Sequence, residues 1–274
     1  MSTTTVFAGL GKGSGKTSAL CLALSEAQKA GPVGVFTIGF DGDETSAVRV
    51  GQGDVVVTTA TLARSAQAGL EIIETLPGRS AIGQLCLCRA VRSGAVALVG
   101  PEHFGHLVWA IEFVRQKGMA NSVLIDGAGA RLTQAGALPD CQLVYCARAD
   151  NANYRRVAEK IDLIAKLADL PLEDGNRQSD NIKCRIDGPL TASILDGLHK
   201  DTTHISIETF ADCFLDAVSF KRASQRYKIM VRRQIPLLGF VVALKNVRPE
   251  IFSAAAPSAS SRIAFNPFEN QELR

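Results

Sequence analysis

Short apolar runs alternate with stretches of helical periodicity through the first 170 residues of the chain. Runs rich in Val, Ile, Leu and Phe predict buried strands, and segments that repeat apolar residues every three or four positions predict helices. The predicted strands are TTTVFA at the start and the segments 33–40, 54–60, 94–100, 121–129 and 141–147. The predicted helices are 18–30, 104–118 and 154–170. This alternation is typical of a mostly parallel sheet covered by helices on both faces.

The character of the sequence changes after residue 170. The segment ADLPLEDGNRQSDN is polar and contains a proline and a glycine, which is typical of a linker or a long surface loop. Short strand-like and helix-like elements follow it. We therefore expect an α/β domain over residues 1–170 and a smaller C-terminal α+β portion over 181–274. The pattern leaves open whether the C-terminal elements form their own unit or extend the first sheet.

The stretch GLGKGSGKTSAL, residues 9–20, lies between the first predicted strand and the first predicted helix. In a P-loop, backbone N–H groups curl round a phosphate at a helix N-terminus, and glycine permits the required backbone angles and close approach. A lysine then adds positive charge, and the next Ser or Thr helps to hold Mg²⁺. The fold class that we predict is therefore a P-loop NTPase. The expected nucleotide-binding residues are Gly11, Lys12, Gly13, Ser14, Gly15, Lys16, Thr17 and Ser18.

The loop departs from the usual GxxxxGK[ST] spacing, which would need glycine where this chain has Leu10. Either the loop is one residue longer, or a neighbouring glycine takes that place. Lys12 is a second lysine in the loop. In P-loop proteins with a deviant loop, a lysine near its start reaches phosphate across a dimer interface, which would make this chain a homodimer. Lys12 stands four positions before Lys16 instead of five, so it is either such a lysine or a solvated one.

Two aspartates follow predicted strands. Asp126 ends the strand in LIDGAG, and Asp41 follows the strand in TIGFDGDE, with Asp43 and Glu44 next to it. The carboxyl ends of parallel strands are where ligands collect, and a carboxylate there can meet Mg²⁺. The alternative is ordinary Asp-Gly turn chemistry. The candidate catalytic residues are Lys16, Asp41 and Asp126, and the candidate metal ligands are Thr17, Asp41 and Asp126.

Composition excludes several classes of protein. Hydrophobic residues make up 46% and charged residues 21%, which is typical of a globular protein, and no apolar run approaches the roughly 20 residues of a membrane span. The start lacks a basic n-region, so we expect no signal peptide and a cytoplasmic location. A net charge of +3 is too small to argue for nucleic acid. The seven cysteines, Cys86 and Cys88 among them, are better read as buried thiols than as metal ligands.

Other polar clusters carry less information. His103 and His106 stand at the start of a predicted helix, where contact with a ligand is one interpretation and a solvated or capping role is the other. The run KRASQRYKIMVRR, residues 221–233, has six basic residues and no acidic one. Such a run is usually a solvated face, and an acidic protein partner is the alternative.

Taken together, GKGSGKT, TIGFDGDE and VLIDGAG resemble the dethiobiotin-synthetase-like branch of P-loop proteins, whose third motif has an acidic residue followed by Gly-Ala-Gly. Within that branch the chain is more similar to the ATPase subunit of the reactivating factors for B12-dependent lysine and ornithine aminomutases. The shared features are TIGFDGDE, GRSAIGQLCLCRAVRSGAVALVGP, LIDGAG followed by Arg131, and AFNPFE near the end. The resemblance covers most of the chain, and the phosphate loop and DGAG are its chemically specific parts.

The resemblance implies an ATPase that uses ATP and Mg²⁺ to help a cobalamin-dependent mutase exchange damaged cofactor, together with a second reactivating subunit. Gly13, Gly15, Lys16 and Thr17 would hold phosphate and Mg²⁺, while Asp41 and Asp126 would shape the metal and water site. Leu10 and the end of the chain soon after NPFENQ depart from the family pattern.

Two other functions remain open at this stage. One is an ATP-dependent ligase or kinase of the dethiobiotin-synthetase kind that acts on a small carboxylate or carbamate. The other is a non-catalytic module that nucleotide switches. The absence of the guanine-reading NKxD pattern favours ATP over GTP.

Overall fold

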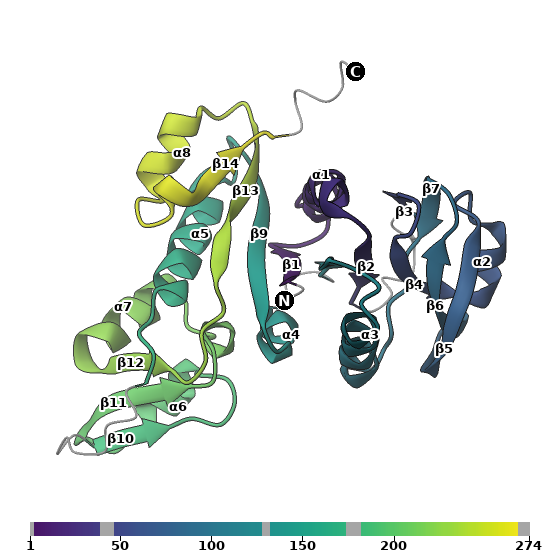
Figure 1. Cartoon of the computed structure of the whole chain (residues 1–274). Helices are drawn as coiled ribbons and strands as arrows, with labels where there is room; N and C mark the ends of the chain where they lie inside the picture. Colours follow the sequence, from purple (N-terminus) through teal and green to yellow (C-terminus); the bar gives the residue numbers. More distant parts are fainter. Residues whose placement is uncertain (1–2, 39–46, 128–131, 174–181, 268–274) are drawn as a thin grey trace.

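A computed structural model of the chain describes residues 3–38, 47–127, 132–173 and 182–267 (Figure 1). Its main sheet has nine strands in the order β14-β13-β9-β1-β8-β2-β4-β6-β5. In that order their bounds are Ile263–Phe265, Leu237–Lys245, Cys141–Asp150, Thr3–Gly9, Ser122–Asp126, Val33–Thr37, Val55–Thr59, Gly83–Ala90 and Leu70–Ser80. The strands from β14 to β4 pair in parallel, and β6 and β5 add an antiparallel pair at one edge. The predicted α/β class with a mostly parallel sheet is confirmed.

Helices cover both faces of this sheet. Consecutive residues of a strand point to opposite faces, so they enter separate apolar clusters. Phe7 of β1 shares a cluster with Leu20 of α1, whereas Val6 shares the other with Leu107 of α3. Figure 1 accordingly shows α1 on one side of β1 and β2, with α3 and α4 on the other side. The bounds are α1 Lys16–Ala27, α3 Phe104–Gln116, α4 Leu132–Ala137 and α5 Tyr154–Ala168.

One predicted strand lies elsewhere than expected. We expected 94–100 to belong to the parallel sheet, but β7 (Gly94–Ala97) pairs antiparallel with β3 (Ala47–Val50) in a separate two-stranded sheet. The strand that precedes β7 in the main sheet is β6, and it occupies the edge of β4 that β2 leaves open. Both edges of β4 are then paired, so β7 cannot join the main sheet beside β4, and it pairs with β3 instead. The helix α2 (Ala60–Ser65) follows β4 directly.

The chain beyond residue 181 contributes to two sheets. First it forms a small parallel sheet of β10, β11 and β12, with two helices beside it. It then returns to the main sheet as β13 and β14, with α8 between them. The bounds are β10 Ile182–Arg185, α6 Ala192–Asp196, β11 Thr202–Ile207, α7 Ala217–Arg226, β12 Lys228–Val231 and α8 Pro249–Ala255. The division into domains at 170 and 181 stays a prediction.

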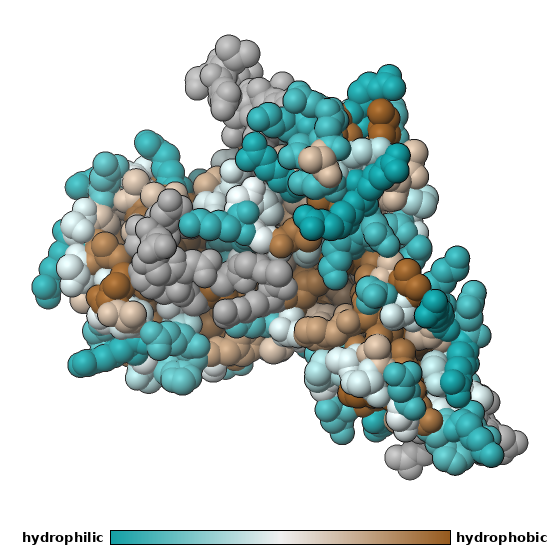
Figure 2. Space-filling view, turned by 180° about the vertical axis from the view of Figure 1, so that it is seen from behind, coloured by the Kyte–Doolittle hydropathy of each residue, from teal (hydrophilic) through white to brown (hydrophobic). Residues whose placement is uncertain are grey.

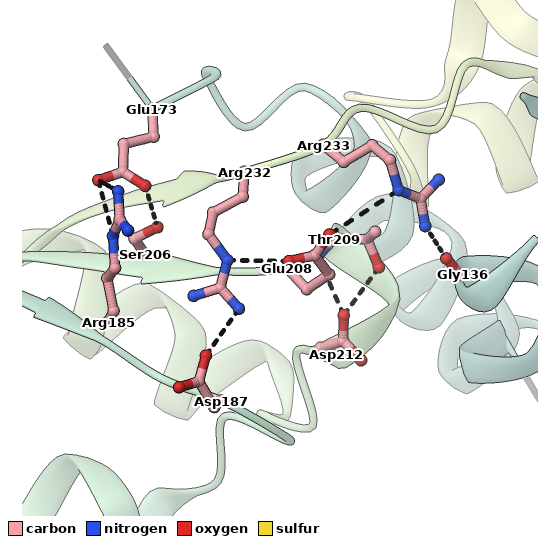
Figure 3. Close-up of polar contacts among 10 residues, drawn as sticks. All are labelled: Gly136, Glu173, Arg185, Asp187, Ser206, Glu208, Thr209, Asp212, Arg232 and Arg233. Carbon is pink, nitrogen blue, oxygen red and sulfur yellow. Dashed lines mark hydrogen bonds and ion pairs between the residues drawn. The ribbon is translucent and has the colours of Figure 1, made fainter. Parts of the chain in front are cut away.

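An arginine beyond β12 joins the small sheet to α4 (Figure 3). The Arg233 guanidinium donates to the backbone oxygen of Gly136 and, at 3.2 Å, to that of Leu138. Its Nε lies 3.9 Å from Glu208, which also accepts a hydrogen bond of 2.9 Å from Arg232. The last turn of α4 leaves its carbonyl groups without partners inside the helix. Arg233, which follows β12 of the small sheet, therefore supplies hydrogen-bond donors to the carbonyl groups at the end of α4.

Close packing strengthens the same junction. A Cβ on Gly136 would lie 3.0 Å from Thr209 Oγ1 and 3.1 Å from Ala211 Cβ, so the backbone of α4 touches the segment after β11. Asp212 accepts hydrogen bonds from both the N–H and the hydroxyl of Thr209, at 3.0 and 2.9 Å, which holds that segment in place. The small sheet is thus attached to the main body by packing as well as by Arg233.

The described helices are all too short or too polar to cross a membrane. The longest of them, α5, has 15 residues, whereas a span of hydrocarbon needs about 20. Seen from behind, the surface is a mixture of hydrophilic and hydrophobic patches (Figure 2).

Replacing Arg233 by alanine should lower the free energy of unfolding by about 1–2 kcal/mol, because two carbonyl oxygens at the end of α4 lose a charged donor. Urea unfolding followed by circular dichroism measures this. The control is Lys221→Ala, since Lys221 is exposed on α7 and its loss should change stability by less than about 0.5 kcal/mol. Equal stability of the two variants would contradict the structural role of Arg233.

Candidate functional site

The loop between β1 and α1 has the backbone of an anion site. Gly13 and Gly15 have φ angles of 74° and 85°, in the left-handed region that glycine alone enters without strain. Gly15 caps α1, and no side chain bonds the cap. The first backbone N–H groups of a helix have no partner within it, and they carry the positive end of the helix dipole. The start of α1 is therefore available to a phosphate.

The structure identifies which glycine stands at the start of the loop. A Cβ on Gly9 would lie 2.4 Å from Ser14 Oγ and 2.6 Å from the backbone oxygen of Cys146, so this position has no room for a side chain. A Cβ on Gly11, in contrast, would meet nothing within 4 Å. Five residues separate Gly9 from Gly15, where the usual pattern has four. The tightly packed glycine is thus consistent with a loop that is one residue longer.

Lys16 lies across this loop. Its Nζ donates a hydrogen bond of 2.9 Å to the Gly11 backbone oxygen and lies 3.5 Å from Ser14 Oγ. Ser14 is buried and Lys16 is half-buried. The ammonium group is therefore held against the loop that would surround a phosphate, by contacts with neutral oxygens.

Thr17 and Asp126 meet although 109 positions separate them in the chain. The Thr17 hydroxyl donates to Asp126 Oδ2 at 2.8 Å, and Asp126 is 5% exposed. The backbone oxygen of Asp126 accepts from the Thr37 hydroxyl at 3.1 Å and from the Ile38 N–H at 3.0 Å. The end of β2 and the start of α1 thus both contact Asp126, β2 at its backbone oxygen and α1 at its carboxylate.

The Asp-Gly sequence at this point has a packing reason. Gly127 N–H donates to the Phe7 backbone oxygen at 2.9 Å, and a Cβ on Gly127 would lie 2.7 Å from that same oxygen. Only glycine allows the chain to leave β8 so close to β1. The position of Asp126 beside the loop follows from the parallel pairing of Phe7 with Asp126.

The remaining candidates divide into those that the structure describes and those that it does not. Asp41, together with Asp43 and Glu44, lies outside the described residues. Ser18 and Lys12 are described and exposed.

The two histidines pack away from this loop. His103 and His106 form an edge-to-face pair with ring centroids 5.5 Å apart. The ring of His106 also lies against Gly78 of β5, where a Cβ would come within 2.3 Å of Nδ1.

Thiols near the site are poor nucleophiles. Burial raises the pKa of Cys146 to about 12, although the charge of Lys16 acts in the opposite direction. Burial, with a contribution from Asp126, also raises the pKa of Cys21 on α1. Because the thiolate is the reactive form, these side chains are inert at neutral pH.

Sequence reasoning missed a second set of residues beside the loop. A groove of about 700 Å³ is lined by residues 10–14 and by side chains from the end of β9 and the first turns of α5. These are Arg148, Asp150, Asn153, Arg156, Val157 and Lys160. A signal did exist, because Arg148 and Asp150 directly follow the strand predicted at 141–147, and Arg156 and Lys160 are four positions apart on a predicted helix.

Comparison with known proteins adds little to this geometry. No protein-family model matches the chain, and no curated protein sequence matches it. One solved structure is similar, the MinC:MinD cell division protein complex of Aquifex aeolicus. The similarity covers 94% of this chain and 87% of that one, at 10% sequence identity and a TM-score of 0.33. At that score we base no conclusion on it.

The two glycines that flank Leu10 should respond differently to alanine. Gly9→Ala should lower the free energy of unfolding by about 2–4 kcal/mol and weaken any ligand of the loop, because its Cβ would collide with the backbone of Cys146. Gly11→Ala is the matched control, with an expected change below about 1 kcal/mol. Thermal unfolding of both variants measures the difference. If Gly11→Ala were the more damaging change, the crowded glycine would be misassigned.

Proposed function

We propose that this chain binds ATP with Mg²⁺ through residues 9–17 and hydrolyses it in the course of acting on a partner protein. The observation that carries the proposal is the 2.8 Å hydrogen bond between Thr17 and Asp126. It brings a hydroxyl beside the glycine loop together with a nearly buried carboxylate from a different strand. Oxygen ligands of these two kinds suit Mg²⁺, which usually takes only one or two protein carboxylates and completes its shell with phosphate and water.

The described residues fit this ion. Among them no group of three His, Cys, Asp or Glu side chains could hold a metal ion. In a complex with ATP and Mg²⁺, Thr17 would coordinate the ion through its hydroxyl oxygen, and Asp126 would either coordinate the ion or accept a hydrogen bond from a water in its shell. Bound Mg²⁺ supplies neutralisation of the charge that develops on the transferred phosphoryl group.

Lys16 would bind the phosphates. Its present partners are the Gly11 carbonyl and Ser14 hydroxyl oxygens. A phosphate oxygen is negatively charged, so it attracts the ammonium as an ion pair, which the neutral carbonyl and hydroxyl oxygens do not. Lys16 would therefore exchange these oxygens for a phosphate, while Gly13 and Gly15 leave the backbone N–H groups of the loop open toward it.

The finer assignment rests on the family resemblance of the sequence. We propose that the partner is a cobalamin-dependent aminomutase and that a second reactivating subunit takes part. Asp41 would then orient the attacking water, and the chain would act as a homodimer. The preference for ATP over GTP belongs to the same proposal.

A ligase or kinase is the second candidate function. The observation that favours it is the groove beside the loop, because its volume of about 700 Å³ falls in the range of small-molecule sites. A small carboxylate or carbamate in this groove would stand next to the nucleotide. The two functions differ in what stimulates turnover, since a ligase needs its small substrate and a remodelling ATPase responds to its partner protein.

Lys16→Ala should weaken ATP binding by roughly 10- to 100-fold, because one charged hydrogen bond to phosphate is lost. Isothermal calorimetry with ATP and Mg²⁺ measures the affinity. Lys29→Ala is the matched control, since Lys29 is an exposed lysine whose ion pair with Glu26 lies on the surface. Unchanged affinity in Lys16→Ala would exclude the loop as the phosphate site.

Phosphate release should separate the two candidate functions. We expect slow basal hydrolysis of ATP that rises when an aminomutase loaded with damaged cobalamin and the second reactivating subunit are added. Asp126→Asn is the negative control, because the amide keeps the size of the side chain and removes the charge that favours Mg²⁺. Stimulation by a small carboxylate or amine, with none from the mutase, would establish the ligase in place of the remodelling ATPase.

A further inference from the structure

Three of the six basic residues in the run 221–233 interact within the molecule. Arg232 pairs with Glu208 and Asp187 at 2.9 and 3.0 Å, and Arg233 bonds the end of α4. The Arg226 guanidinium lies 5.0 Å from the ring centroid of Tyr227. These side chains stabilise the small sheet, so this run is a weaker candidate for binding an acidic partner than its composition indicates.

A stronger concentration of positive charge lies in the groove beside the phosphate loop. Its lining includes four cations, which are Lys12, Arg148, Arg156 and Lys160. In the described parts of the chain, none of the four lies within ion-pairing distance of a carboxylate. All four residues are exposed.

The one acidic residue of the groove is committed to a turn. Asp150 Oδ1 accepts the N–H groups of Ala152 and Asn153 at 2.9 and 3.1 Å. With Asp150 counted, the groove carries an excess of three positive charges, which equals the formal net charge of +3 of the whole chain. The groove is therefore a local concentration of positive charge that attracts an approaching anion.

The first turn of α5 places cations where the helix itself disfavours them. Arg155 and Arg156 stand in this turn, and no acidic residue does. The N-terminus of a helix carries partial positive charge, so an acidic side chain there would stabilise α5 and a basic one opposes it. Residues that oppose local stability are expected where they serve binding. The unfavourable position of Arg156 is therefore an argument that its side chain binds an anionic ligand.

The form of the groove favours a protein segment over a small molecule. Small-molecule sites enclose most of their ligand between apolar walls, with few polar groups. Here the cations are exposed, as charges at the rim of a protein interface are, and such charges steer an oppositely charged partner and fix its register. An extended acidic segment could contact all four cations at once.

We propose that this groove binds an acidic segment of the partner protein against the outer side of the phosphate loop. Lys12, Arg148, Arg156 and Lys160 hold its carboxylates. Residues 10–14 belong both to the groove and to the loop, so the segment touches the backbone that would hold nucleotide. Nucleotide and partner then change each other's affinity by the same factor, as linkage requires. This coupling rests on the proposed function, whereas the binding of the acidic segment does not.

Fluorescence anisotropy with a fluorescein-labelled peptide of ten glutamates tests the groove in the full chain. At low salt, about 50 mM, wild-type protein should bind this peptide, and a Gly-Ser peptide of equal length should not bind. Arg156→Glu combined with Lys160→Glu should weaken binding by about tenfold or more. The melting temperature should not fall, because glutamate at position 156 is in the first turn of α5, where it is favourable, and Lys160 is exposed.

The matched control reverses two equally exposed charges on another helix. Lys221→Glu combined with Arg222→Glu on α7 makes the same change in net charge and should alter peptide affinity by less than about twofold. Equal weakening in both double variants would mean that net charge alone binds the peptide, and this would overturn the proposal. Absence of peptide binding to the wild-type protein would also overturn it.

Two further measurements decide the class of ligand and separate this proposal from the ATPase assignment. Lys16→Ala should lose nucleotide affinity and keep peptide affinity. The peptide can therefore still bind the groove if the assignment of the nucleotide site is wrong. In this same variant, inorganic tripolyphosphate serves as competitor. If it displaced the peptide at concentrations below the dissociation constant of the peptide itself, the groove would be a site for a small polyanion, and the protein-segment proposal would be wrong.

Discussion

The hydrogen bond between Thr17 and Asp126 depends on how closely β1 and β8 pack at their carboxyl ends. The parallel register pairs Phe7 with Asp126, and Gly127 then follows β1 so closely that a side chain would collide with the Phe7 backbone. Gly9 makes an equally close approach to Cys146 on the other neighbour, β9. Three strands therefore hold the ends of the loop at fixed positions. The position of Thr17 beside Asp126 is therefore determined more by the pairing of these strands than by the loop itself.

Strand β8 and the helix that follows it connect the loop to the small sheet. β8 ends at Asp126, α4 begins at Leu132, and Arg233 holds the last turn of α4. In the sequence, only five residues separate Asp126 from the start of α4. The last turn of α4 is in turn bound by Arg233 of the small sheet. Figure 3 shows the side chain of Arg233 reaching Gly136 of α4. Such a connection gives the small sheet a physical link to the site, whichever function the site performs.

Charge is distributed unevenly between these parts. In the small sheet, arginines pair with Glu173, Glu208 and Asp187, so basic residues there serve the fold. Beside the loop, basic side chains from β9 and α5 face a groove without such pairing among the described residues. Surface ion pairs contribute little to stability, whereas unpaired cations that converge on one groove create a field that extends over about one Debye length. The arginines of the small sheet are thus engaged in the fold, whereas the cations of the groove remain available to a ligand.

Much of the fold could be predicted from local pattern alone. The helices expected at 104–118 and 154–170 are observed at Phe104–Gln116 and Tyr154–Ala168, because apolar periodicity is a local property of the chain. Glycine spacing likewise indicated a loop with left-handed backbone, which Gly13 and Gly15 have.

What the sequence could not determine depends on contacts between distant segments. It left open which glycine starts the loop, and the packing of Gly9 against Ser14 and Cys146 decided this. It placed β7 in the wrong sheet, because the edges available to a strand depend on the strands already paired there. The groove combines residues 10–14 with side chains more than a hundred positions away, and only the parallel pairing of β1 with β9 brings them together. Local pattern determines which elements form, and the pairing of strands decides which of their side chains meet.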